Sequence, residues 1–93
     1  MRIIGYIEHP SLKISVFKND GRTSVKFETS RYEQTFKLGE DERFATVEGV
    51  QKLVDGPMIE KVLEGFRQMH STSLEAIVRA FPTPEVALFE DII

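Results

Sequence analysis

The sequence of 93 residues contains no cysteine. This absence excludes disulfide bonds, a thiol nucleophile and every zinc site built from thiolates, and it leaves the redox compartment open. Glycine-rich phosphate loops are absent as well, because the glycines are isolated and form neither a P-loop nor a dinucleotide-binding pattern.

No hydrophobic run is long enough to cross a membrane. The apolar segment that follows Arg2 ends at Glu8, which is too short for a signal-peptide core or a membrane span. We therefore expect a cytoplasmic protein without a membrane partner. The formal net charge of −3 also argues against indiscriminate binding to polyanions, since such proteins usually carry a net positive charge.

The composition is that of an ordinary globular protein, with 41% hydrophobic residues, seven phenylalanines and 29% charged residues. A chain of this length forms one domain around one core. We predict a single domain over residues 1–93, with a β-meander in 1–38, a helical part in 46–81 and a docking tail in 82–93.

The charges segregate along the chain. Residues 1–38 carry seven Lys/Arg against four Asp/Glu, a net charge of +3, whereas residues 39–93 carry five against eleven, a net charge of −6. This contrast predicts a basic sheet combined with acidic helices.

Alternating apolar residues predict the strands. Leu12, Ile14 and Val16 alternate with polar residues. Asn19-Asp20-Gly21 is typical of a tight hairpin turn. The apolar positions change from odd to even numbers between Phe27 and Phe36, which requires a turn between them. The fold class that we predict is α+β, with a four-stranded antiparallel meander whose strands lie near residues 2–8, 12–17, 22–28 and 32–38.

Two helices are expected to follow and to pack on one face of the sheet. A short one lies behind a Thr46 cap, and a long C-terminal one runs from Pro57 to about Phe81, because its apolar residues advance by three or four positions without a break. The alternative divides the long helix near His70, since Thr72 to Glu75 matches a capping box. The core residues that we predict are Ile14, Val16, Val25, Phe27, Phe36, Leu38, Leu63, Phe66 and Ile77.

The outward face of the sheet combines cations with an aromatic ring, as a surface for single-stranded nucleic acid does. Glu28 and Glu33 lie among the cations and are able to pair with them across strands, so an ordinary solvated face remains the alternative. The nucleic-acid-binding hypothesis depends on Lys13, Phe17, Lys26, Arg31 and Lys37.

Four strands followed by a long helix is an order similar to that of the Pur-type and whirly-type nucleic-acid-binding modules. The likeness concerns element order alone, and no sequence motif accompanies it. We therefore assign the chain to no family on this ground.

The tail after Pro84 ends in apolar residues. Leaving Phe89, Ile92 and Ile93 in water would expose a sticky surface, so we predict that they dock on the domain or form a homodimer interface.

Catalytic and metal sites have little support in the sequence. The acidic run Glu40 to Glu42 lacks the ligand spacing of a calcium loop and suits a helix N-terminus. His9 lies beside a proline in a predicted turn, and His70 lies on the apolar stripe of the long helix without a carboxylate three or four residues away.

We accordingly expect no enzyme, no metal and no cofactor. The function that we predict is a small interaction or assembly module, homodimeric, with a possible protein partner. Single-stranded nucleic-acid binding is the alternative, and an enzyme would require a pocket between sheet and helix that holds a perturbed titrating group.

Overall fold

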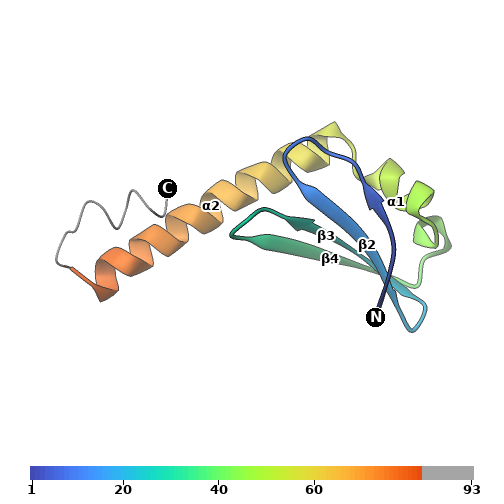
Figure 1. Cartoon of the computed structure of the whole chain (residues 1–93), viewed down its shortest axis with the longest axis horizontal. Coiled ribbons are helices and arrows are strands. Elements are labelled where there is room, and N and C mark those ends of the chain that lie inside the picture. Colours follow the sequence, from blue (N-terminus) through green and yellow to red (C-terminus); the bar gives the residue numbers. More distant parts are fainter. Residues whose placement is uncertain (83–93) are drawn as a thin grey trace. The chain divides into compact units, whose positions relative to one another are not determined.

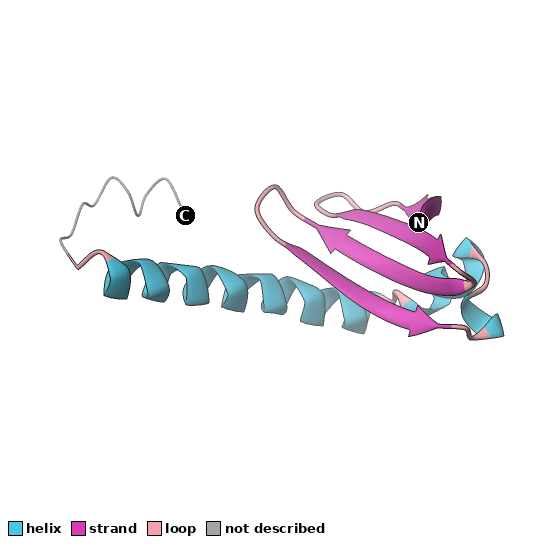
Figure 2. Cartoon of the chain, turned by 90° about the horizontal axis from the view of Figure 1, so that it is seen from below, coloured by secondary structure: helices cyan, strands magenta, loops and turns pink. Residues whose placement is uncertain are grey.

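A computed structural model of the chain describes residues 1–82 and has an α+β fold, as predicted (Figure 1). Its strands form one antiparallel sheet in the order β1-β2-β3-β4 (Figure 2). The chain divides after Val62 into two compact units, and the second begins at Leu63. The elements are β1 (Arg2–Ile7), β2 (Lys13–Asn19), β3 (Arg22–Glu28), β4 (Glu33–Gly39), a 3₁₀ turn η1 (Glu42–Phe44), α1 (Val47–Leu53) and α2 (Gly56–Ala80).

Tight turns set the register of the meander. Asp20 and Gly21 both have positive φ angles, 52° and 77°, as the turn between β2 and β3 requires, and Asn19 lies opposite Arg22. The turn between β3 and β4 is closed by Thr29, whose hydroxyl accepts a hydrogen bond from the N–H of Tyr32 at 3.1 Å. The sequence predicts a turn between Phe27 and Phe36, because the apolar positions change from odd to even numbers there, and this is that turn.

The inner face of the sheet carries the core of the first unit. Ile14 lies opposite Phe27, and Val16 lies opposite Val25, so these four buried side chains share one face. Val50 of α1, Val54 just after that helix and Val62 of α2 are buried as well, and so is the polar Thr23 at the end of β3 that lies beside the hairpin turn.

Helix α1 begins at the predicted cap, because the Thr46 hydroxyl accepts a hydrogen bond from the Gly49 N–H at 3.2 Å. The helix lies against β1, where an ideal Cβ on Gly5 would come within 2.5 Å of a methyl group of Val47. A Cβ on Gly49 would overlap the main-chain carbonyl oxygen of Arg43. The absence of a side chain therefore lets Val47 pack against the backbone at Gly5 and lets the Arg43 carbonyl approach the backbone at Gly49.

Helix α2 is one continuous helix of 25 residues. The prediction of a single long helix is therefore confirmed, and the alternative of two helices divided near His70 is wrong. Asp55 caps it by accepting a hydrogen bond from the Met58 N–H at 2.9 Å. Thr72 does not begin a new helix, because its hydroxyl donates to the Gln68 carbonyl one turn earlier at 2.9 Å. No helix in the described part of the chain has the length and apolarity that crossing a membrane requires.

The predicted core is correct in part. Ile14, Val16, Val25, Phe27 and Phe66 are buried. Leu38, Leu63 and Ile77 are only half-buried. Phe36 lies on the inner face and meets the Phe27 ring edge-on at 5.7 Å between centroids, yet it is 38% exposed. The prediction that Phe36 is buried is wrong, because β4 is an edge strand and has a neighbouring strand on one side only.

Candidate interaction surface

The outer face of the sheet is built from three rows of side chains that the strand register places side by side. Residues directly opposite each other in an antiparallel sheet point to the same face. One row contains Ile3, Phe17, Ser24 and Lys37, the next contains Tyr6, Ser15, Lys26 and Thr35, and the third contains Lys13, Glu28 and Glu33.

Apolar side chains on β1 are exposed on this face. Ile3 is 46% exposed and Tyr6 is 56% exposed, and Phe17 lies directly opposite Ile3. Ser15 lies opposite both Tyr6 and Lys26 and is only 1% exposed, so the larger side chains around it cover it. We call Ile3, Tyr6, Phe17, Lys13 and Lys26 the outer patch.

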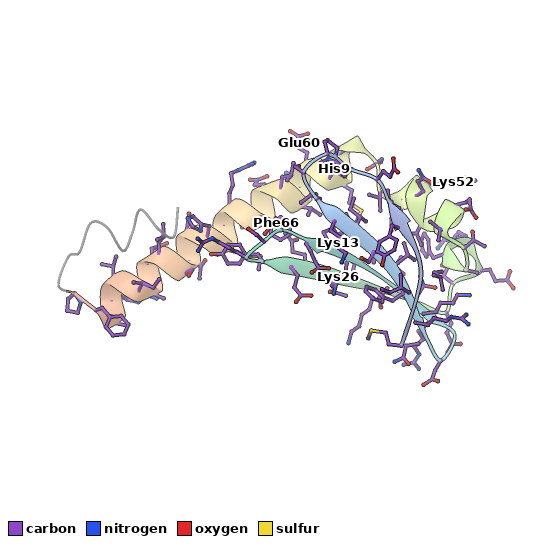
Figure 3. The ribbon with its side chains drawn as sticks, in the orientation of Figure 1. His9, Lys13, Lys26, Lys52, Glu60 and Phe66 are labelled. Carbon is purple, nitrogen blue, oxygen red and sulfur yellow. The ribbon has the colours of Figure 1, made fainter. Side chains whose placement is uncertain are left out.

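Both lysines of the outer patch lie over aromatic rings. The ammonium of Lys26 is 5.1 Å from the centroid of the Phe17 ring, and that of Lys13 is 6.0 Å from the centroid of the Tyr6 ring. A cation at this distance is attracted by the negative face of the ring. Figure 3 labels Lys13 on β2 and Lys26 on the neighbouring strand β3.

Lys26 is also neutralised by two carboxylates. Its ammonium lies 3.4 Å from Glu28 and 3.8 Å from Glu33. Glu33 lies opposite Glu28 on the neighbouring strand, and a shared cation between them relieves the repulsion of two like charges. The cross-strand pairing that the sequence left open is therefore present at this position.

The other two residues that were predicted to bind nucleic acid, Arg31 and Lys37, lie apart from the outer patch. Arg31 lies in the turn between β3 and β4 and not on a strand. Lys37 is exposed on β4, and no ion pair is found for it within residues 1–82. Arg22 at the far end of β3 pairs with Glu40 at 3.5 Å. The structure thus brings Lys13, Phe17 and Lys26 together, with Lys37 at the sheet edge.

His9 lies in the turn between β1 and β2, where its Nδ1 accepts a hydrogen bond from the Ser11 N–H at 3.1 Å. The Ser11 hydroxyl also lies 3.3 Å from this nitrogen. An open depression of about 560 Å³ borders the turn and is lined by His9, Pro10 and Leu12 among others. The histidine contact closes a local turn, and both side chains belong to an exposed loop.

The acidic segment before α1 stabilises local structure. The carboxylate of Asp41 accepts hydrogen bonds from the Arg43 side chain, at 2.6 Å from its Nη2, and from the Arg43 main-chain N–H at 2.9 Å. These hydrogen bonds lower the pKa of Asp41 to about 2, because they favour the charged carboxylate. No cluster of three or more His, Cys, Asp or Glu residues with metal-binding geometry occurs in the described part.

Helix α2 has a second set of exposed apolar side chains near its C-terminal end. Val78 is 49% exposed, and Phe81, just after the helix, is 67% exposed. His70 is half-buried earlier in the same helix. The predicted dimer residues Phe89, Ile92 and Ile93 lie outside the described residues, and so does the rest of the predicted tail from residue 83 onward.

The exposure of Ile3 and Tyr6 is the feature that the sequence analysis missed. The register of β1 shifts between Ile3 and Gly5, which makes Ile4 an extra residue in the strand. Ile3 and Tyr6 therefore share the outer face although their numbers differ in parity. A glycine among β-branched residues in a strand is the only sequence signal for such a bulge, and it is a weak one.

Comparison of the chain with protein-family models, with curated proteins and with solved structures found no match.

Proposed function

We propose that this chain is a non-enzymatic interaction module that works as a homodimer and binds a protein partner through the outer patch. The observation that carries the proposal is the exposure of Ile3 and Tyr6, at 46% and 56%, on a sheet face that also presents Phe17. Exposed apolar side chains that cluster on one surface are typical of interaction sites. The cytoplasmic location expected from the sequence stays part of this proposal.

The charges around the patch favour a protein partner over nucleic acid. Lys26 is already engaged by Glu28 and Glu33, and it covers one side of the Phe17 ring. A phosphate backbone would have to displace these carboxylates, and a base would have to displace the ammonium from the ring. Aromatic side chains surrounded by charges of both signs suit the mixed polarity of a protein interface.

The sheet edge supports the homodimer. Phe36 of β4 remains 38% exposed although it belongs to the core-facing side of the sheet. A second copy that covers this strand would bury more of the ring, which a single chain leaves in contact with water.

The experiment that tests the proposed function begins with pull-downs from cell extract with three forms of the full chain. These are the wild type, an Ile3→Ser/Tyr6→Ser double variant and a Lys52→Ser control on exposed α1 surface. Each protein retained by the wild type and the control is purified and titrated against all three forms. We expect the double variant to bind at least about tenfold more weakly and the control to bind like the wild type. Equal binding by the double variant would contradict the role of the outer patch.

A second candidate function is the binding of single-stranded nucleic acid. Lys13 favours it, because this lysine is exposed and no ion pair is found for it within residues 1–82. The test is fluorescence anisotropy of labelled DNA and RNA oligonucleotides at ~50 mM and ~200 mM salt, because phosphate contacts weaken as the salt concentration rises. Salt-dependent binding that is lost in a Lys13→Glu/Lys37→Glu variant would favour this function, and no binding at ~50 mM salt would exclude it.

A further inference from the structure

Strand β4 presents an edge that is suited to a second copy of the same strand. It stands at one end of the sheet and pairs with β3 only, among the elements of the described chain (Figure 2). An edge strand offers a row of main-chain N–H and C=O groups that pair readily with another strand. Thr35 and Lys37 are exposed on its outer face, and Phe36 is partly exposed on its inner face.

Charge complementarity selects one register for such a pairing. Two identical antiparallel strands are related by a two-fold axis normal to the sheet, so residues equally spaced about the axis face each other. With the axis at Thr35, Glu33 faces the partner's Lys37 and Lys37 faces the partner's Glu33. Both opposite-charge pairs lie on the outer face, with the two threonines between them.

Neighbouring registers lack this complementarity. With the axis at Phe36, Glu33 faces the partner's Gly39 and Lys37 faces the partner's Thr35. With the axis at Gln34, Glu33 faces the partner's Thr35 and Lys37 faces the partner's Arg31, a pair of like charges. Only the Thr35 register therefore places each carboxylate of the edge opposite an ammonium.

Glu33 and Lys37 of β4 are exposed and therefore able to make these contacts. The Glu33 side chain is 62% exposed, and its distance of 3.8 Å to Lys26 leaves its other oxygen accessible to a second cation. On the inner face, Phe36 faces the partner's Gln34 in the same register, so that the partner strand covers the exposed part of the ring.

We propose that two copies of this chain pair through β4 in the antiparallel, Thr35-centred register and form one continuous eight-stranded sheet. The inference rests on the homodimer of the proposed function and identifies its interface. A two-fold axis normal to the sheet keeps both outer faces on the same side. The dimer would then present two outer patches to a partner on one surface, which raises the avidity for a partner with repeated binding elements.

Cysteine crosslinking tests the register directly, because the natural chain has no cysteine. A Thr35→Cys variant places the two thiols opposite each other across the axis, within reach of a disulfide. We expect mild oxidation with diamide to convert most of this variant into a covalent dimer on non-reducing gels. The control is Thr72→Cys at another exposed threonine, on α2, and this variant should stay monomeric on the same gel.

Charge exchange provides the second arm of the test, with the mass measured by light scattering and sedimentation equilibrium. Glu33→Lys and Lys37→Glu each create like-charge pairs at both ends of the interface, so each should weaken dimerisation about tenfold or more. The double exchange restores opposite charges and should recover the wild-type dimer. Both residues are exposed, and circular dichroism verifies that each variant is folded.

The outcomes separate the interface from the proposed homodimer. A wild-type chain that is monomeric up to about 100 µM would overturn both, because it would leave no self-association with a dissociation constant in or below that range. A wild-type dimer in which position 35 does not crosslink would overturn the β4 interface alone, as would a dimer that the single charge exchanges leave unchanged. Crosslinking at position 35 together with rescue by the double exchange would support it.

Discussion

The side-chain amide of Gln34 donates a 2.8 Å hydrogen bond to the main-chain carbonyl of Val62, which ties edge strand β4 to helix α2. The two residues are 28 positions apart in the sequence. Because edge strands are held by one neighbour only, this contact supplies β4 with a second anchor on the inner face of the sheet.

Replacing Gln34 with Ala should therefore destabilise the chain by about 0.5 to 1.5 kcal/mol, the usual net contribution of a hydrogen bond. The Val62 carbonyl lies within a helix, so the loss of the amide does not leave it without a donor. Urea unfolding followed by circular dichroism measures the change. Gln68→Ala, the same substitution on the exposed surface of α2, is the control and should have less than half the effect.

The strand and helix pattern could be predicted from the sequence because local chemistry determines it. Asp20-Gly21 sets the hairpin turn, Thr46 caps α1, and the apolar stripe of α2 continues through Thr72. In the last case two signals disagreed. The helix continues as the apolar stripe predicts, because the Thr72 hydroxyl donates its hydrogen bond to a carbonyl of the same helix and does not cap a new one.

The surface could be predicted only in part, because it depends on register and on the position of each strand in the sheet. The alternation of β2 and β3 was sufficient to place Lys13, Phe17 and Lys26 on one face. The alternation did not encode the bulge at Ile4, and although the predicted meander places its fourth strand at an edge, the predicted core still treated Phe36 of that strand as buried. Those two features expose Ile3, Tyr6 and Phe36.

Phe66 and Phe81 lie on the same apolar stripe but differ in burial, at 7% and 67% exposed. We expect Phe66→Ala to cost about 3 to 5 kcal/mol, since it removes a buried aromatic ring and leaves a cavity. Phe81→Ala should cost less than about 1 kcal/mol. Urea unfolding of both variants makes the comparison, and a loss below about 1 kcal/mol for Phe66→Ala would show that its ring is not part of a core.

The pair of Asp41 and Arg43 predicts how stability depends on pH. The pKa of Asp41 is lowered to about 2 in the folded chain, whereas a free aspartate titrates near 4. The stabilisation is therefore complete above about pH 4 and is lost as the pH falls toward 2.

An NMR titration of the Asp41 carboxyl carbon gives the folded pKa directly. Asp41→Asn should remove this part of the acid dependence and leave the dependence above pH 5 unchanged. A midpoint near 4 in the wild type would contradict the hydrogen bonds to Arg43.

Replacing glycine with alanine is expected to affect the stability of the chain differently at Gly49 and at Gly56. Replacing glycine with alanine in a helix usually stabilises it by up to about 1 kcal/mol. At Gly56 the added Cβ meets no heavy atom within 4 Å outside its chain neighbours and its own helix backbone, and Pro57 follows it, so Gly56→Ala should change the stability by less than about 1 kcal/mol. At Gly49 the Cβ would overlap the Arg43 carbonyl oxygen, which belongs to the backbone and is not easily displaced.

We therefore expect Gly49→Ala to destabilise the chain by about 1 to 3 kcal/mol, as overpacking does elsewhere. Urea unfolding measures both variants, and the sign of the change decides the outcome. If Gly49→Ala proves as stable as Gly56→Ala, α1 does not approach the 3₁₀ turn as closely as the structure shows. The close approach matters for the outer patch, because α1 lies against β1, the strand that carries Ile3 and Tyr6.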